Sequence, residues 1–98
     1  MGISIKHAEF LLASRMADAG QGDAAALYEL GVAFSTGSGG VDVDLIEAHK
    51  WFNLAALNGN KEAMGCRAEI SDDMAPEEIA EAQRQARAWL NAHDRRAA

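Results

Sequence analysis

The chain of 98 residues contains one cysteine, one proline and few aromatic residues. A single cysteine, Cys66, excludes an internal disulfide and leaves no cysteine pattern around which a zinc site could form. Aromatic residues make up only 6% of the chain, whereas alanine occurs 21 times. Because alanine is the strongest helix former and a poor strand former, the composition predicts an all-α protein.

Basic residues are also scarce, since nine Lys and Arg face 15 Asp and Glu, which gives a net charge of -6. Nucleic acids and anionic membranes attract basic surfaces, so this balance argues against both as partners. No apolar run approaches the roughly 20 residues of a membrane span. The first residues also lack the pattern of a secretory signal. We therefore expect a soluble, cytoplasmic protein.

Turn residues divide the chain into five helical segments. Asp23 has the side chain of a helix N-cap, and Asp44 with Glu47 has the spacing of a capping box. The pair Asn58-Gly59 is typical of a helix end, and Pro76 suits a first helical position. The predicted segments cover residues 4–20, 23–36, 42 or 44 to 58, 61–71 and 76–92, and a tail follows over residues 93–98.

The sequence repeats itself weakly. Residues 22–26 (Gly-Asp-Ala-Ala-Ala) are similar to residues 59–63 (Gly-Asn-Lys-Glu-Ala), 37 positions later. The same offset relates Gly31 to Ala68, two small residues that allow helices to approach closely. Large residues such as Trp51 and Phe52 are expected to fill the space beside them. The sequence therefore predicts helix pairs built from alternating small and large residues.

A longer pattern of small, apolar and aromatic residues spans positions 26–59. It comprises Ala26-Leu27-Tyr28-Glu29-Leu30-Gly31, Phe34, Gly37, Gly40-Val41, Asp44, Ala48, Trp51-Phe52, Ala55-Ala56 and Gly59. This pattern resembles the Sel1-like repeat family, which is related to the tetratricopeptide repeats. The resemblance implies a single domain over residues 1–98, folded as a short, right-handed α/α solenoid of antiparallel helix pairs.

The same resemblance implies how the chain is divided and what it does. Residues 4–20 would be half of a preceding unit, 22–59 a full repeat and 60–92 a degenerate terminal repeat. Members of the family are similar to tetratricopeptide proteins in serving as adaptors within assemblies. The resemblance thus implies a non-catalytic interaction module without a cofactor.

Motifs that would indicate a catalytic, metal or phosphate-binding site are weak in this sequence. The glycine-rich stretch 36–40 is followed by Val-Asp rather than the Lys of a phosphate-binding loop, and nearby acidic residues lack calcium-loop spacing. The three histidines, His7, His49 and His93, are far apart and are expected to be solvated or half-buried. Cys66 has no histidine near it in sequence. We therefore predict no catalytic, metal or cofactor site.

The concave face of the predicted solenoid is the candidate binding surface. In tetratricopeptide-like stacks, the first helix of each pair lines this face. We hypothesise that this face receives a basic, partly apolar peptide or helix; the alternative interpretation is an ordinary acidic surface on an acidic protein. Two further hypotheses are a regulatory subunit that binds a ligand near Tyr28, Asn53 and His49, and a homodimer formed through apolar end faces. The face comprises Ala25, Glu29, Val32, Ser35, Glu62, Cys66, Glu69 and Asp72.

Overall fold

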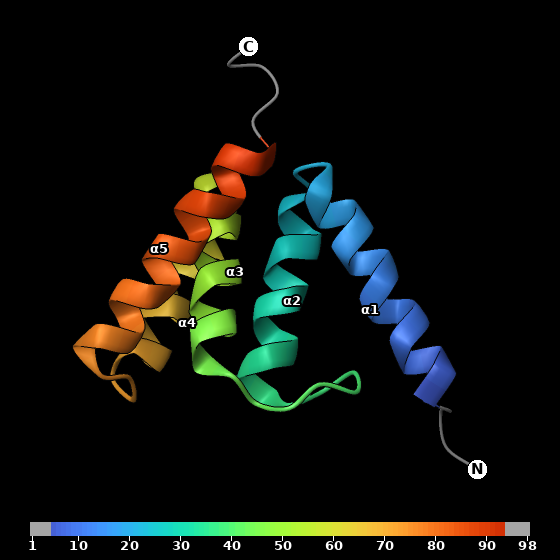
Figure 1. Cartoon of the computed structure of the whole chain (residues 1–98), viewed down its shortest axis with the longest axis horizontal. Coiled ribbons are helices and arrows are strands. Elements are labelled where there is room, and N and C mark those ends of the chain that lie inside the picture. Colours follow the sequence, from blue (N-terminus) through green and yellow to red (C-terminus); the bar gives the residue numbers. More distant parts are fainter. Residues whose placement is uncertain (1–4, 94–98) are drawn as a thin grey trace.

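Five α-helices follow one another along the chain (Figure 1). The computed structural model describes the backbone of residues 5–93 and the side chains of residues 10–93. No β-strand occurs within this part of the chain, which confirms the predicted all-α class. The predicted first residue of the first helix and most of the predicted tail lie outside it. The helices are α1 (Ile5–Gly20), α2 (Ala24–Thr36), α3 (Leu45–Leu57), α4 (Lys61–Ser71) and α5 (Pro76–His93).

Asp and Asn side chains fix where three helices begin. The Asp23 carboxylate accepts hydrogen bonds from the backbone N–H groups of Ala25 and Ala26 at 2.9 and 3.2 Å. Asp44 and Asn60 each accept from the N–H three residues later, at the starts of α3 and α4. These bonds satisfy N–H groups that have no partner inside the helix. The predicted helix starts are confirmed because the capping signals are local.

Helix α3 is the central element of the fold. Helices α2, α4 and α5 all pack against it, while α1 packs mainly on α2 (Figure 1). Burial of one large apolar side chain contributes roughly 1.5–3 kcal/mol. The largest fully buried side chains all belong to α2 and α3, so this helix pair holds most of the core. They are Leu27, Leu30, Phe52 and Leu54.

The α2–α3 pair is closest where Gly31 faces the ring of Phe52. A Cβ atom at Gly31 would lie 2.5–2.9 Å from three ring carbons of Phe52. Optimal contacts between carbon atoms are about 3.5–4.0 Å, so any side chain at this position would collide with the ring. Phe52 itself is only 1% exposed. The predicted packing of a small residue against a large one is confirmed at this contact.

The second unit packs less regularly. Ala68, which corresponds to Gly31 by the 37-residue offset, is exposed. Helices α4 and α5 both pack on α3 and make little contact with each other. Helix α4 buries only Ala63 completely, because few of its residues are large and apolar. The helices still pack as a short repeat solenoid would, and the unit boundaries remain a prediction.

The histidines differ from expectation. His49 is only 3% exposed rather than solvated or half-buried, because it belongs to the central helix and has neighbours on several sides. His93 is not part of a tail, since it is the last residue of α5. Its ring stacks on Trp89 with centroids 3.9 Å apart, and its Nδ1 lies 2.8 Å from the Trp89 carbonyl oxygen. The side chain of His7 lies outside the described residues.

The Gly31–Phe52 contact generates a stability prediction. Substitution Gly31→Ala should lower the free energy of unfolding by about 1–3 kcal/mol, because the added methyl group overpacks the contact with Phe52. Thermal or urea unfolding followed by circular dichroism measures the change.

Gly65 supplies the matched control. It lies within α4, and a Cβ atom there would meet nothing within 4 Å. Gly65→Ala should therefore raise the free energy of unfolding by about 0.5–1 kcal/mol through helix propensity alone. If the two substitutions change stability equally, the close approach at Gly31 is not the limiting contact.

Candidate functional site

The eight residues of the predicted face lie on α2, on α4 and just after α4; we call this set the α2–α4 surface. Helices α2 and α4 touch each other, and both pack on α3. The structure therefore places the two halves of the set on neighbouring helices. Val32, Ser35 and Cys66 are half-buried. The exposed members are Ala25, Glu29, Glu62, Glu69 and Asp72.

Tyr28 joins the two helices. The Cys66 Sγ lies 3.9 Å from the Tyr28 hydroxyl oxygen, to which the thiol donates a weak hydrogen bond. The hydrogen bond and electrostatic effect of Cys66, burial and the nearby Glu62 carboxylate together raise the pKa of Tyr28 above its usual value. The Tyr28 ring also lies 5.7 Å from that of Phe52 on α3. Tyr28 is thus uncharged and lies at the contact between α2 and α4.

Sequence reasoning missed Tyr28 as a member of this surface. The signal was present, because Tyr28 lies three residues after Ala25 and four before Val32, which is the spacing of one helix face. The corresponding position in the second unit is Gly65, and this difference concealed its role.

Glu29 of the α2–α4 surface also contacts a residue of α1. Arg15 on α1 lies 3.4 Å from its carboxylate, between Nε and Oε1. The two side chains are 32% and 53% exposed, so water screens the pair and it contributes little to stability. Helix α1 therefore places one positive charge at the edge of the α2–α4 surface.

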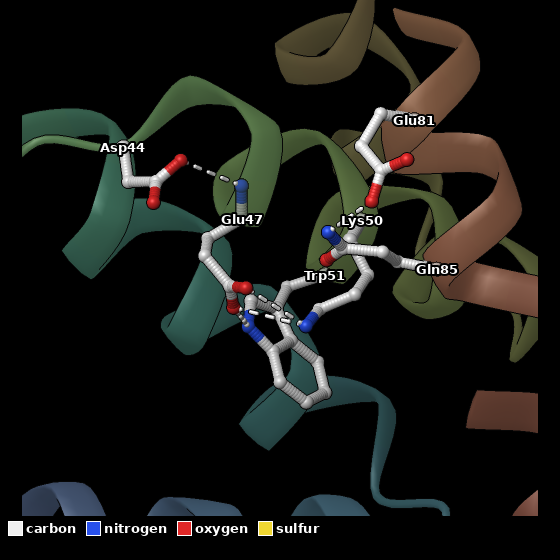
Figure 2. A network of polar contacts seen from close by, with 6 residues as sticks. All are labelled: Asp44, Glu47, Lys50, Trp51, Glu81 and Gln85. Carbon is white, nitrogen blue, oxygen red and sulfur yellow. Dashed lines mark hydrogen bonds and ion pairs between the residues drawn. The ribbon is translucent and has the colours of Figure 1, made fainter. Parts of the chain in front are cut away.

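A second polar cluster lies on α3, outside this surface (Figure 2). The Glu47 carboxylate accepts hydrogen bonds from the Trp51 indole N–H and from Lys50 Nζ, both at 3.0 Å. Lys50 Nζ also lies 4.7 Å from the centroid of the Trp51 ring. On the other side, Trp51 meets Trp89 of α5 edge to face, with centroids 6.0 Å apart. The cluster orients the aromatic contact between α3 and α5.

This cluster corrects the expected capping box. Asp44 does cap α3, since it accepts from the Glu47 N–H at 3.1 Å. The reciprocal bond is absent from the described hydrogen bonds, because the Asp44 N–H donates to the Phe34 carbonyl instead. The Glu47 side chain instead points toward the C-terminal end of α3. There it accepts hydrogen bonds from the Lys50 ammonium group and from the Trp51 indole N–H.

Most of the polar residues that were considered as contacts for a ligand between helices already have hydrogen-bond partners within the protein. Tyr28 contacts Cys66, and Asn53 accepts a hydrogen bond from Arg67 on α4. His49 differs, because its Nδ1 is buried and has no hydrogen-bond partner. Burial and then the positive charge of Arg67 lower the pKa of His49 below 6.5. Both effects disfavour the charged form of this histidine.

Among the described residues, no three His, Cys, Asp or Glu side chains are grouped closely enough to hold a metal ion. None of the helices in the same part of the chain is both long and apolar enough to cross a membrane. Several of the described acidic groups act as helix caps or in ion pairs, as Asp44 and Glu47 do.

Glu81 on α5 gives a pH prediction for this part of the fold. Hydrogen bonds from Arg84 and then from Gln85 lower the pKa of Glu81 from 4.5 to about 2. Because the pKa in the folded state is below the unfolded value, the stabilisation is complete above pH 4.5. It is lost as the pH falls from there to about 2. Substitution Arg84→Gln should raise the pKa of Glu81 toward 4.5, measured by NMR titration of the carboxyl carbon.

Arg87, an exposed arginine on the same helix, supplies the control for this measurement. Arg87→Gln should leave the pKa of Glu81 unchanged. A pKa near 4.5 in the unmodified protein would contradict the role given to Arg84.

Comparison with known proteins gives one match. Residues 24–60 match the family model described as the Sel1 repeat. No curated protein and no solved structure matches the chain. The matched residues run from α2 through α3 to the N-cap of α4, and thus cover the helix pair with the Gly31–Phe52 contact. Residues 24–60 are therefore a Sel1 repeat, consistent with a protein of the Sel1-like repeat family.

Proposed function

We propose that the chain is a non-catalytic interaction module that binds a basic, partly apolar peptide or helix on the α2–α4 surface. Sel1 repeats generally mediate protein–protein interaction, which supports the class of function. The observation that carries the choice of surface is the charge on two neighbouring helices. Four exposed carboxylates lie there: Glu29, Glu62, Glu69 and Asp72.

The surface combines charge with apolar contact. The carboxylates attract a basic partner and set its orientation, whereas burial of apolar area provides much of the affinity. Val32, Cys66 and Tyr28 are half-buried and supply the apolar part. A basic residue of the partner would compete with Arg15 for Glu29, since the two would share the same carboxylate.

Rigid presentation is the mechanism. Helices α2 and α4 are both held by α3, and they touch through Tyr28 and Cys66. A surface that is already formed loses little conformational entropy when it binds, which favours affinity. No proton transfer or covalent step is required of any residue.

A charge-reversal variant tests the proposal. Glu29→Lys with Glu69→Lys should weaken binding of a basic partner by at least about tenfold, because like charges would then face each other. It should also reduce the salt dependence of binding. Partners are captured from native lysate, identified by mass spectrometry and then titrated in purified form against each variant.

Asp42→Lys with Glu77→Lys is the matched control. Both residues are exposed and lie outside the α2–α4 surface, and the change in net charge is the same. A partner that the control retains and the first variant loses supports the proposal. A partner that both retain places binding elsewhere. Failure to capture any partner, together with concentration-dependent dimerisation of the chain, would favour self-association instead.

A further inference from the structure

The contact between α3 and α4 contains a buried histidine beside an arginine. His49 and Asn53 are one turn apart and share a face of α3. Arg67 reaches across from α4 and donates a hydrogen bond to the Asn53 side-chain oxygen. His49 is 3% exposed, and its Nδ1 has no partner among the described residues. We call these three residues the α3–α4 joint.

No carboxylate within the described part of the chain forms an ion pair with Arg67. The ion pairs among the described residues join Arg15, Lys50 and Arg84 to their partners and do not include Arg67. Burial of His49 and the charge of Arg67 both disfavour the imidazolium form, and they lower the pKa of His49. A proton on the buried His49 would place a second positive charge beside Arg67, which is itself half-buried.

The other helices packed on α3 offer no compensating charge. Helix α2 faces this region with Tyr28, which is neutral and held by Cys66. Helix α5 packs on another side of α3, since it contacts Trp51, and residues two apart on a helix do not share a face. Two ion pairs lie on these helices, Glu47 with Lys50 and Glu81 with Arg84.

Helix α4 is the element that would respond. It is the shortest helix and buries only Ala63 completely. It makes little contact with α5, so the contact with α3 holds most of it in place. Elements with few buried apolar contacts open locally at lower free energy than the core. A repulsive pair of charges at the joint therefore acts on a helix with little buried apolar area.

We propose that the α3–α4 joint is a proton-sensitive latch, in which protonation of His49 beside Arg67 releases α4 from α3 while α2, α3 and α5 stay packed. The released state binds the proton more tightly than the docked state. Docking is therefore strongest above the ordinary histidine pKa of 6.5 and weakens as the pH falls below it. This inference does not rest on the proposed binding function, although release of α4 would also remove Glu62, Cys66 and Glu69 from the α2–α4 surface.

Amide hydrogen exchange measured by NMR on the full chain tests the latch between about pH 7.5 and about pH 5.5, where histidine titrates but most carboxylates do not. After correction for intrinsic exchange rates, the opening constant of α4 should rise by up to about tenfold per pH unit, the limit for uptake of one proton. Protection in α3 and α5 should stay constant. In the His93→Gln variant, which lacks the ring that stacks on Trp89, the near-ultraviolet circular dichroism of Trp51 and Trp89 should also stay constant, since both lie at the α3–α5 contact.

Three variants assign the effect. His49→Gln should abolish the pH response of α4, and Arg67→Met should weaken it by removing the repulsion. His93→Gln alters an exposed histidine on α5 and should keep the full response. Loss of protection in α4 and α5 together, or a response that survives His49→Gln, would overturn the proposal.

If the His49→Gln variant does not fold, a second measurement tests the proposal. The ring of His49 is then titrated by NMR in the unmodified protein. A pKa below 6.5 supports the latch, whereas a pKa at or above 6.5 overturns it, because docking would then not oppose protonation.

Discussion

The contact of Gly31 with Phe52 sets the spacing on which the rest of the fold depends. The absence of a side chain at Gly31 lets α2 approach α3 until the backbone meets the aromatic ring. Tyr28, one turn earlier on α2, then reaches the same ring and extends its hydroxyl group toward Cys66 on α4. A wider spacing of α2 and α3 would separate Tyr28 from both neighbours. The α2–α4 surface is therefore a consequence of one glycine in the core.

Helix α3 makes three contacts of different physical character. Its contact with α2 is apolar and closely packed, and its contact with α5 is aromatic, with Trp51 oriented by Glu47. The contact with α4 is mixed, since Ala63, Cys66 and Ile70 of α4 pack on the core while Arg67 and Asn53 form a hydrogen bond there. The interactions differ in strength and in response to pH, so one central helix supports a rigid pair on one side and a more easily opened helix on another.

The sequence predicted local features well and spatial ones poorly. Helix starts followed from Asp44 and similar residues, because a cap is recognised by atoms two or three residues away. The side chain of Glu47 was predicted wrongly, since its partners Lys50 and Trp51 compete with the cap. The burial of His49 depends on which helices cover α3, and periodicity within one helix does not specify that. Which residues belong to the α2–α4 surface also stays a prediction, because periodicity within one helix does not specify its neighbours.

The most direct test of this account is a nuclear Overhauser measurement between the α protons of Gly31 and the ring protons of Phe52. The close approach predicts strong cross-peaks and ring-current shifts of the Gly31 α protons. These signals would show that the two helices meet backbone to ring in solution. Absent cross-peaks, with α-proton shifts typical of an exposed helical glycine, would contradict the packing from which the surface is derived.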